Sequence, residues 1–460
     1  MSKLDNITLS HYNQVYFLGI GGIGMSALAK YFISEGKEVL GYDKTPSGIT
    51  DNLNALGAKI HFDDKGETVG ELINKNETLV IRTPAVPVNF GELTYFQSNG
   101  YQLFKRSEVL GILTRNYKGL GVAGTHGKTT TSCLLAHVLN ESPLHCNAFL
   151  GGISSNFESN FLSNPEAEFT VIEADEFDRS FLQLKPFASI ITAMDPDHLD
   201  IYGTVENFNK GFNDYANLID KDGLLVLKSG IDLKTSTNTK TYGINHSSAD
   251  YNATGLRFEN EKFLFDVSGP NMNWQNVHLG IPGIHNAENA LSCIVLLDWL
   301  GLSEREIRHG LSTFKGVKRR FDYHINKDNF IYIDDYAHHP TEIKALLDSI
   351  ELLYPNRTKI GVFQPHLFSR TRDFFDGFAE QLSRLDEVIL MPIYPAREEP
   401  IPGITSDALL GKITAKHKVL LSADKVTNHI KTLDDCVLLT IGAGDIDRLV
   451  PEITKIKTEI

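Results

Sequence analysis

One arrangement occurs three times in this chain of 460 residues: a short apolar run enters a turn, and a helical stretch follows. The first copy starts with the apolar run at 14–20, the second near residue 119, and the third after Gly316. Strands that alternate with helices indicate βαβ units and parallel sheets. We therefore predict an α/β fold of three consecutive domains, which agrees with about 150 residues per domain. The predicted domains are 1–107, 108–314 and 315–460.

One segment departs from this pattern. Residues 240–282 have short alternating runs rich in Asn, Gly and Ser. Such runs indicate antiparallel strands or hairpins, so we expect a small added β region at the edge of the central domain. In the third domain, amphipathic patterns predict helices at 341–353 and 373–385.

The composition excludes several classes of function. The formal net charge is −14, whereas a general nucleic-acid binder needs clustered Lys and Arg for the phosphate backbone. No apolar run reaches the roughly 18 residues of a membrane span, and the first residues lack a signal-peptide pattern. The cysteines are too widely spaced for a disulfide framework, which fits a reducing compartment. They are Cys133, Cys146, Cys293 and Cys436. We expect a cytoplasmic protein.

The first glycine cluster fits the dinucleotide-binding fingerprint G-x-G-x-x-G. Gly19, Gly21, Gly22 and Gly24 lie between a predicted strand and helix, and Asp43 ends the next strand. The glycines let the backbone approach a pyrophosphate at a helix N-terminus, and the acid can accept a hydrogen bond from a ribose hydroxyl. A nucleotide-sugar presents the same groups as NAD, so the two ligands stay open, as does a tight turn without a ligand.

The second glycine cluster, AGTHGKTT, is a near match to a Walker A loop. Val122 stands where the first glycine of the strict pattern belongs, but Gly127, Lys128 and Thr129 keep its functional end. In such loops backbone N–H groups surround phosphates, the lysine contacts β/γ oxygens and the threonine hydroxyl binds Mg²⁺. The alternative is an accidental sequence on a surface turn.

Two further residues follow strands of the central domain, where open α/β sheets place their sites. Glu173 ends one strand and His198 follows the next. Glu173 is a candidate Mg²⁺ ligand because this ion prefers oxygen. His198 is an unusual ligand for Mg²⁺, and by itself such a residue is more often a hydrogen-bonded loop histidine than a metal ligand.

The third domain has short basic and histidine-rich motifs. The cluster at 318–320 fits either a solvated linker or a phosphate clamp. His338 and His339 are adjacent without a third ligand at zinc spacing, so zinc is not expected. Arg370 and Arg372 can bind a carboxylate with two hydrogen bonds each, or lie exposed at the start of a helix.

Taken in order, a series of motifs matches one family. They are GIGGIGMSALA, AGTHGKTTT, EADEFDRSFL, DHLDIY, HNAENAL, RRFD, DDYAHHPTE, FQPHLFSRTRDF, YPAREEPIPG and GAGD. With these motifs the chain resembles the ATP-dependent Mur ligases of peptidoglycan synthesis over nearly its whole length. The resemblance implies a Rossmann-like UDP-binding domain, a P-loop-type ATP-binding domain and a Rossmann-like C-terminal domain for the amino-acid substrate.

The resemblance also implies site residues. ATP would contact Gly124, Thr125, His126, Gly127, Lys128, Thr129, Thr130, Asn286, Asn289 and Arg320. The UDP-sugar would contact Gly19, Gly21, Gly22, Gly24, Asp43, Thr83, Pro84 and Ala85. The metal ligands would be Thr129, Glu173 and His198. The acyl and amino-acid substrates would face His338, His366 and Arg370. Catalytic roles would fall to Lys128, His198, Arg320, Asp335 and His339.

Within the family, the chain is most similar to ligases that join L-alanine to the lactyl carboxylate of UDP-N-acetylmuramate. The resemblance implies an acyl phosphate, ATP and Mg²⁺ as cofactors, and release of ADP and phosphate. Which of His198, His338 and His339 takes the proton from the amine stays open. The expected partners are these small molecules, without nucleic acid or a membrane span, and the protein is expected to be a monomer or homodimer.

Three alternatives stay open on the sequence. A ligase that adds intact murein tripeptide to the same UDP-sugar shares the first-domain and ATP motifs. An NAD-dependent dehydrogenase with an appended nucleotidase would use the first glycine cluster. A catalytically silent nucleotide-binding switch would keep the second cluster, but it has no need of the motifs in the third domain.

Two positions depart from the family pattern. Many relatives have Arg after the His of the FQPH motif, and this chain has Leu367, so Arg370 is the better candidate for a carboxylate contact. Some Mur ligases use a carbamylated lysine where this chain has Asn213, with Lys210 three residues away. We assign no carbamate.

The phosphate-loop interpretation has a direct test. Lys128→Ala should abolish ATP-dependent phosphate release while circular dichroism shows an intact fold, because the ammonium group is the expected contact of the transferred phosphoryl group. Normal phosphate release by this variant would contradict the interpretation.

Overall fold

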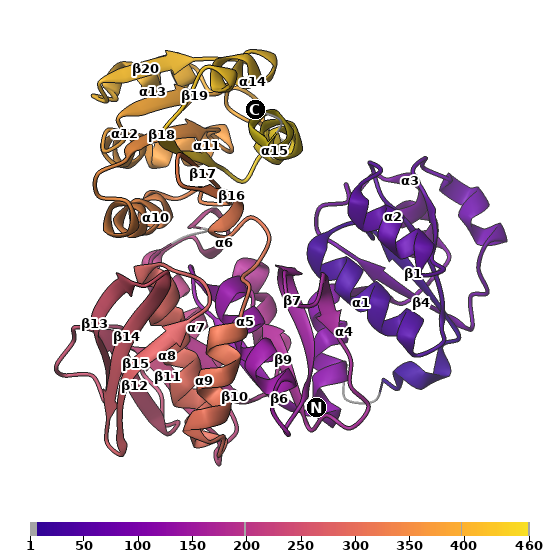
Figure 1. Ribbon diagram of the computed structural model, residues 1–460. Helices are drawn as coiled ribbons and strands as arrows, with labels where there is room; N and C mark the ends of the chain where they lie inside the picture. Colours follow the sequence, from indigo (N-terminus) through magenta and orange to yellow (C-terminus); the bar gives the residue numbers. More distant parts are fainter. Residues whose placement is uncertain (1–6, 197–198, 397, 459–460) are drawn as a thin grey trace. The chain divides into compact units, whose positions relative to one another are not determined.

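The described part of the chain, residues 7–196, 199–396 and 398–458 of a computed structural model, contains three β-sheets with helices beside each of them (Figure 1). The α/β fold class is confirmed. The chain divides into two units. The first unit comprises Met1–Gly255, Phe265–Leu279 and Glu288–Lys315, and the second comprises Leu256–Leu264, Gly280–Ala287 and Gly316–Ile460. The predicted domain limits at 107 and 314 stay a prediction.

The first sheet has the order β3-β2-β1-β4-β5, and all its pairings are parallel. Its strands are β1 (Gln14–Leu18), β2 (Glu38–Tyr42), β3 (Lys59–His61), β4 (Thr78–Arg82) and β5 (Leu103–Lys105). The order reverses between β1 and β4, which is where open α/β sheets bind ligands. Leu18 and Arg82 form the last pair of β1 and β4 at that place. The next residues, Gly19 and Thr83, are therefore neighbours where the chain leaves the two strands.

Among the helices beside the first sheet, the sequence predicted the one that follows the glycine cluster. α1 (Ile23–Ser34) begins directly after the glycine cluster. α2 (Gly48–Ala55) begins with a capping box between Ser47 and Thr50, which satisfies backbone N–H groups that have no partner within the helix. The remaining helical segments are α3 (Gly91–Ser98), α4 (Arg106–Leu113), η1 (Leu9–His11), η2 (Gly66–Glu71) and η3 (Thr114–Asn116).

The second sheet has the order β15-β14-β13-β12-β11-β10-β6-β9-β7-β8. Its strands are β6 (Lys118–Ala123), β7 (Cys146–Ser154), β8 (Ser159–Leu162), β9 (Phe169–Glu173), β10 (Pro186–Ile191), β11 (Leu225–Lys228), β12 (Thr239–Ile244), β13 (Tyr251–Glu259), β14 (Lys262–Gly269) and β15 (Met272–Leu279). The helices are α5 (Lys128–Asn140), η4 (Phe177–Gln183), α6 (Leu199–Tyr202), α7 (Val205–Ala216), α8 (Ile284–Trp299) and α9 (Glu304–Thr313).

The segment 240–282 agrees only partly with its prediction. β13, β14 and β15 are consecutive neighbours at the edge of the sheet, as hairpins would be. β12, however, pairs in parallel with both β11 and β13, so the prediction of antiparallel strands was wrong there. Periodicity describes the two faces of a strand and does not reveal its direction, so only the pairing decides it.

The third sheet has the order β16-β17-β21-β18-β19-β20, and apart from the antiparallel β16–β17 pair its pairings are parallel. Its strands are β16 (Asp322–Lys327), β17 (Phe330–Asp335), β18 (Thr358–Phe363), β19 (Glu387–Leu390), β20 (His417–Leu420) and β21 (Cys436–Ile441). β17 and β21 are buried at every residue, as expected for strands covered on both faces.

Helices cover the third sheet, and α10, α12 and α13 pack together while α14 packs with α15 (Figure 1). The helical segments are α10 (Pro340–Leu353), α11 (Phe368–Asp373), α12 (Phe375–Leu382), α13 (Ser406–Lys412), α14 (Ala423–Lys431), η5 (Asp445–Leu449) and α15 (Val450–Thr458). The helix predicted at 373–385 is present as α12. It begins at Phe375 because Phe374 leaves the helical conformation (φ −114°, ψ 19°) and separates α12 from α11.

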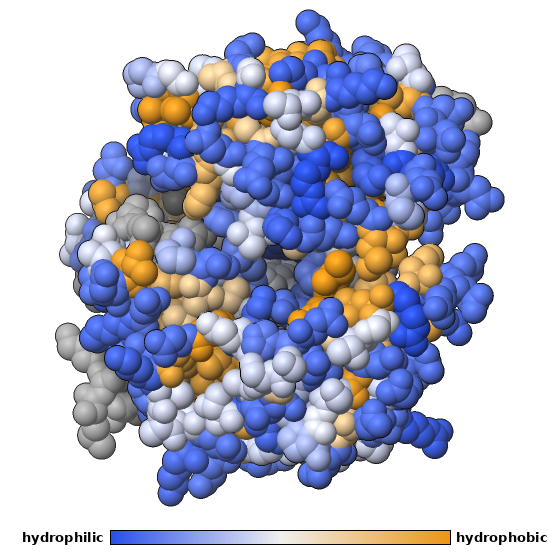
Figure 2. Space-filling model, turned by 90° about the vertical axis from the view of Figure 1, so that its left-hand side faces the viewer, coloured by the Kyte–Doolittle hydropathy of each residue, from blue (hydrophilic) through white to orange (hydrophobic). Residues whose placement is uncertain are grey.

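Hydrophilic side chains predominate on the face that Figure 2 shows, and apolar residues lie scattered among them. Among the described residues the large apolar side chains with most exposure include Val88 at 83% and Leu56 at 47%. In the part of the chain that the structure describes, no helix is both long enough and apolar enough to cross a membrane.

Asn160 of β8 joins the glycine-rich start of α1 to the second sheet. Its amide nitrogen donates to the Ile23 carbonyl at 2.6 Å and to Ser26 Oγ at 2.9 Å, and its oxygen accepts from Lys30 Nζ at 2.9 Å. The side chain is fully buried. Asn160 therefore satisfies three polar groups of α1 at once.

Asn160→Ala should lower the free energy of unfolding by about 1–3 kcal/mol, since it leaves buried polar groups without partners. Chemical denaturation followed by fluorescence measures this change. The control is Asn54→Ala, an exposed position on α2, whose effect should stay within about 0.5 kcal/mol. Equal effects of the two variants would contradict the assigned role of Asn160.

Candidate functional site

The second glycine cluster forms a loop between β6 and α5. Gly124 and Gly127 have φ values of +132° and +79°, and Gly127 is the residue before the first turn of α5. The loop is tied to the segment after β10, because Thr125 N–H donates to the Ala193 carbonyl at 3.1 Å. Thr192 Oγ1 donates to the Ala123 carbonyl at 3.2 Å and also to the His126 carbonyl. Backbone N–H groups at such a helix start attract anions.

Gly127 is required by close packing as well as by its conformation. A Cβ atom at this position would lie 2.7 Å from Asn289 Oδ1. Asn289 lies on α8 and is 7% exposed. The structure thus brings the predicted residue Asn289 to the loop. Asn286, one turn earlier, is also buried, and its amide donates to the Pro282 carbonyl at 2.7 Å.

Lys128, the first residue of α5, makes a buried ion pair. Its ammonium group lies 3.0 Å and 2.8 Å from the two carboxylate oxygens of Glu176 and donates to the Gly124 carbonyl at 2.7 Å. Burial disfavours the charge of Lys128, but the nearby carboxylates of Glu176, Asp175 and Glu173 outweigh it and raise its pKa above the usual value. Lys128 is therefore cationic throughout the physiological pH range.

Glu173 fits a metal ligand. One of its carboxylate oxygens is buried with no hydrogen-bond partner among the described residues. Its carboxylate occupies the space that a side chain at Gly151 of β7 would need. A buried carboxylate oxygen without a donor suits a hard cation such as Mg²⁺. The predicted partner Thr129 is 8% exposed in the first turn of α5, and Thr130 follows it with the same exposure.

Two other predictions about the central site have different outcomes. His198 lies outside the described residues, so its predicted role stays a prediction. Lys210 is on the surface, where its ammonium group pairs with Asp214 at 2.7 Å and its side chain is 70% exposed. This position is consistent with assigning no carbamate to Lys210. His126 lies 3.6 Å from the Asp195 carboxylate.

The first glycine cluster forms the turn from β1 into α1. Gly21 N–H donates to Asp43 Oδ2 at 2.7 Å, so the predicted acid holds the turn itself. Gly19 (φ +86°) packs against Thr83, the residue after β4, and Thr83 Oγ1 accepts from Ala85 N–H at 3.4 Å. The structure therefore brings together Gly19, Asp43 and the Thr83-Pro84-Ala85 segment.

Arg106 was not predicted as a site residue. Its guanidinium group occupies the space that a side chain at Gly24 would need, beside the N-terminus of α1. It also lies 3.5 Å from the Asp175 carboxylate. A cation next to a glycine-rich helix start adds to an anion site. No local sequence pattern links Arg106 to the glycine cluster, because the two are more than 80 residues apart in the sequence.

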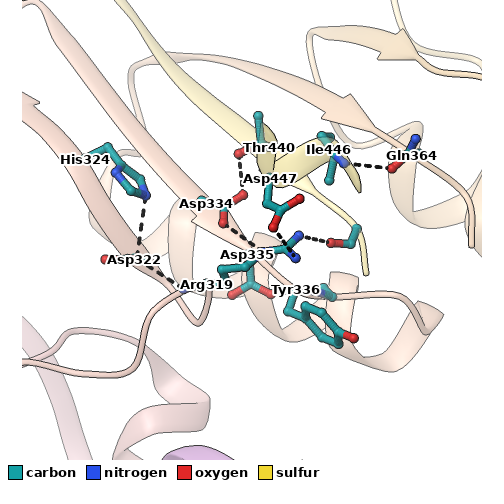
Figure 3. Close-up of polar contacts among 12 residues, drawn as sticks. Arg319, Asp322, His324, Asp334, Asp335, Tyr336, Gln364, Thr440, Ile446 and Asp447 are labelled. Atoms are coloured by element: carbon teal, nitrogen blue, oxygen red, sulfur yellow. Dashed lines mark hydrogen bonds and ion pairs between the residues drawn. The ribbon is translucent and has the colours of Figure 1, made fainter. Parts of the chain in front are cut away.

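In the second unit, loops after three parallel strands meet at one edge of the sheet. Gly442 N–H, after β21, donates to the Asp335 carbonyl at 3.0 Å, and Gln364 N–H, after β18, donates to the Ile441 carbonyl at 3.0 Å. Gln364 also donates to Asp445 at 2.8 Å. It accepts from Ile446 N–H at 2.9 Å (Figure 3). The DDYAHHP, FQPH and GAGD motifs are thereby neighbours.

Arg319 links this edge to the turn before β16 (Figure 3). It donates to the Gly442 carbonyl at 2.7 Å and pairs with Asp334 at 3.3 Å and with Asp447 at 3.4 Å. Within the cluster at 318–320, Arg319 therefore stabilises the fold through these contacts. They favour neither of the two predicted roles for Arg319, a solvated linker or a phosphate clamp. Neighbouring Arg320 remains 29% exposed.

Arg320 and Asp335 are placed together by backbone contacts. Asp335 accepts from Phe321 N–H and Ala337 N–H, both at 2.8 Å. Arg320 stacks over Tyr336, with 4.9 Å from its guanidinium carbon to the ring centre, and lies 3.7 Å from the Glu342 carboxylate. Burial raises the pKa of Asp335 to about 6, although Arg320 opposes the shift. The carboxylate of Asp335 therefore orients the turn that carries Arg320.

The two adjacent histidines have different environments. His338 has Nδ1 3.0 Å from the Tyr336 carbonyl, and burial is the main cause that lowers its pKa, so the ring is neutral near pH 7. His339 accepts from Thr341 N–H at 3.2 Å and caps α10. His339 thus has a structural role in the described residues, and its predicted catalytic role stays a prediction.

His366 and Arg370 lie beside the loop after β19. His366 stacks on Tyr394 with ring centres 5.7 Å apart, and Arg370 Nη1 lies 3.4 Å from His366 Nδ1. Leu367 adopts φ +69° and is the N-cap residue directly before α11. Ser369 N–H donates to Glu398 at 2.9 Å. The FQPH and YPAREEPIPG motifs therefore lie together.

Family models match three consecutive segments of the chain. Residues 14–118 match "Mur ligase family, catalytic domain", residues 122–297 match "Mur ligase middle domain", and residues 319–446 match "Mur ligase, glutamate ligase domain".

Curated relatives are similar over nearly the full length. The UDP-N-acetylmuramate–L-alanine ligase of Phocaeicola vulgatus is 48% identical over 443 residues, which are 95% of this chain and 97% of the relative. The enzyme of the same name from Parabacteroides distasonis is 47% identical over 448 residues and 96% of each chain.

Solved structures are similar as well. A UDP-N-acetylmuramate–alanine ligase from Thermotoga maritima has a TM-score of 0.83 at 28% identity and covers 97% of this chain and 99% of its own. A murein peptide ligase from Psychrobacter arcticus has a TM-score of 0.69 at 20% identity, with the same coverage, and shares the fold.

The Arg319 contacts make a testable prediction for the second unit. Arg319→Ala leaves the Asp334 carboxylate, which is 1% exposed, without its cation. Breaking one partner of a buried pair lowers the free energy of unfolding by about 3–5 kcal/mol. Denaturant unfolding measures the loss, and Arg372→Ala, at an exposed position of α11, is the control with little expected effect.

The loss should depend on pH. Burial raises the pKa of Asp334, and Arg319 and Thr440 oppose that shift. A carboxyl whose folded pKa is raised contributes stability at low pH that is lost as pH rises through that pKa. Without Arg319 the pKa rises further, so the deficit should be larger near pH 8 than near pH 5. A deficit that is independent of pH would contradict the pairing.

Proposed function

Because this chain belongs to the Mur ligase family, we propose that it joins L-alanine to the lactyl carboxylate of UDP-N-acetylmuramate with ATP. The observation that carries this proposal is the 48% identity to a ligase of that name across 95% of the chain. ADP and phosphate are the other products. The same similarity disfavours the dehydrogenase and the silent nucleotide-binding switch.

The loop from Gly124 to Thr130 is the proposed ATP site. Its glycines expose backbone N–H groups at the start of α5. Lys128 supplies a positive charge at the same place, and its raised pKa keeps that charge throughout the physiological pH range. These groups suit the β- and γ-phosphates. Asn289, which packs against Gly127, would limit the space beside the loop.

Thr129 and Glu173 are the proposed Mg²⁺ ligands, together with His198. The buried oxygen of Glu173 that lacks a donor is the observation in favour. When bound, Mg²⁺ neutralises phosphate charge and polarises the transferred phosphoryl group. Lys128 and Glu173 then have complementary roles, since one contacts the phosphates directly and the other holds the ion.

The turn from Gly19 to Gly24 is the proposed site for the UDP diphosphate. Its peptide N–H groups lie at the start of α1, and the Arg106 guanidinium is beside Gly24. Asp43 Oδ2 accepts from Gly21 N–H at 2.7 Å and Oδ1 accepts from Thr45 N–H at 3.3 Å, so Asp43 holds the turn in shape. A carboxylate oxygen can accept a second hydrogen bond, and the proposed donor is a ribose hydroxyl. Thr83, Pro84 and Ala85 border the same turn.

The reaction requires activation of a carboxylate. A lactyl oxygen attacks the γ-phosphorus, the bond to the ADP oxygen breaks, and an acyl phosphate forms. The amine of L-alanine then attacks the acyl carbon, and the carbon–oxygen bond to phosphate breaks. Lys128 and Arg320 are the proposed cations that stabilise charge on the phosphoryl group during transfer. Arg370 is the proposed contact of the alanine carboxylate.

The amine must lose a proton before or during its attack. Among the histidines, we favour His338 as the acceptor. Its Nδ1 faces the Tyr336 carbonyl and the Glu342 carboxylate, so that nitrogen carries the hydrogen and Nε2 has the free lone pair. His339 uses Nδ1 to cap α10. A cytoplasmic location and a monomeric or homodimeric state stay predictions from the sequence.

A reaction with purified protein tests the proposal. UDP-N-acetylmuramate, L-alanine, ATP and Mg²⁺ together should release phosphate, and omission of any one should abolish the release. ATP affinity should fall strongly when Mg²⁺ is chelated, because the chain has a net charge of −14 and both nucleotide substrates are polyanions. Lys128→Ala should lose turnover. It leaves Glu176 buried without its cation, so its fold should be checked by circular dichroism.

A panel of acceptors distinguishes the related activities. L-alanine should be used better than glycine, L-serine or murein tripeptide. Preference for the tripeptide would identify a recycling ligase instead. The absence of phosphate release from the complete mixture would overturn the proposed reaction.

A further inference from the structure

The ammonium group of Lys128 has an acceptor for each of its three hydrogens. They are the Gly124 carbonyl at 2.7 Å and the two Glu176 oxygens at 3.0 Å and 2.8 Å. An ammonium group has three donors. A phosphate oxygen can therefore bind Lys128 only if one of these contacts is lost.

The pair is almost entirely shielded from water. The Glu176 side chain is 1% exposed and the Lys128 side chain is 14% exposed. Hydrogen bonds between two charged groups are strong, and they are screened little where water is excluded. Glu176 is therefore a strong competitor for the cation that the phosphate loop offers.

Glu176 is fixed in place by its own backbone. Its carbonyl accepts from the Tyr202 hydroxyl at 2.7 Å and from Arg179 N–H at 3.0 Å. Tyr202 is 2% exposed, and the Arg179 guanidinium lies over its ring at 5.3 Å. A carboxylate on such a braced turn keeps its position. Lys128 carries its ammonium group on a flexible four-carbon side chain, so it is the partner with more freedom to change position.

We propose that Glu176 is a positioning residue whose carboxylate binds the Lys128 ammonium group when no phosphate is bound. Glu176 then sets nucleotide affinity, because its carboxylate competes with phosphate for the ammonium group of Lys128. The inference rests on the proposed function, since it assumes that the loop binds a nucleotide. Binding exchanges a Lys128–carboxylate pair for a Lys128–phosphate pair. The contribution of Lys128 to nucleotide affinity is then only the difference in free energy between the two pairs. Without nucleotide, the pair with Glu176 keeps the ammonium group of Lys128 in a defined position.

Removing the charge of Glu176 should tighten nucleotide binding. Glu176→Gln keeps the size of the side chain and two polar atoms, but replaces an ion pair by a neutral contact. A purely structural glutamate predicts the opposite result, because its loss would disorder the loop and weaken binding. The direction of the change in affinity therefore distinguishes the two roles.

The experiment is a calorimetric titration of the full-length protein with ADP and Mg²⁺. Glu176→Gln should lower the Kd about tenfold, which corresponds to about 1.4 kcal/mol. In steady-state assays the KM for ATP should fall while the KM for UDP-N-acetylmuramate stays unchanged. The matched control is Asp178→Asn on the same turn, which loses the partly exposed pair with Lys105 at 2.7 Å and should leave the Kd unchanged.

A second variant keeps the test decisive if the first does not fold. Glu176→Asp keeps the charge but withdraws it by one methylene from Lys128, so its Kd should lie between those of the wild type and Glu176→Gln. An unchanged or raised Kd in the folded variants overturns the role of Glu176 and leaves the proposed function standing. A wild-type protein that binds no ADP overturns both.

Discussion

Parallel strands end at a common edge of their sheet, and the candidate sites of this protein depend on that constraint. The turns after β1 and β4 bring Gly19 and Thr83 together in the first sheet. The turns after β6 and β9 bring Lys128 and Glu176 together in the second. In the third sheet the same geometry joins the loops after β17, β18 and β21. Residues far apart in sequence thereby become neighbours without any long connecting loop.

Local charge, more than net charge, determines how an acidic chain can handle anionic substrates. Lys128 stays cationic because three carboxylates surround it, although it is buried. Those same carboxylates oppose a phosphate, so the proposed Mg²⁺ at Glu173 and the proposed displacement of Lys128 from Glu176 would both relieve that repulsion. Arg106 pairs with Asp175 in the same way beside the first glycine cluster. Beside both glycine clusters the structure therefore pairs a cation with an acid.

The sequence predicted the fold well where a motif has a fixed relation to a strand and a helix. Both glycine clusters, the strands around them and the start of α10 follow from local patterns. The parallel pairing of β12 did not follow, since alternation carries no direction. The helix predicted at 373–385 is present as α12, and only its ends differ, because helix ends are the least certain part of a local pattern. Glu176 and Arg106 were not singled out, because each acquires its role from a partner distant in sequence. Arg319 was noted only as part of the basic cluster at 318–320, and its contact with the Gly442 carbonyl needed the structure.

By itself, the sequence determined which residues are available for chemistry and on which turns they lie, because glycine conformations, helix starts and buried strands are local properties. It also indicated the family, through the order of its motifs. Only the tertiary structure decided which charges face each other. In the tertiary structure Lys128 pairs with Glu176, and Asp43 accepts a hydrogen bond from Gly21 N–H. Asp335 accepts a hydrogen bond from the turn that carries Arg320. These pairings depend on strand order and on burial, which arise when the sheets assemble and have no signature in a single segment of the chain.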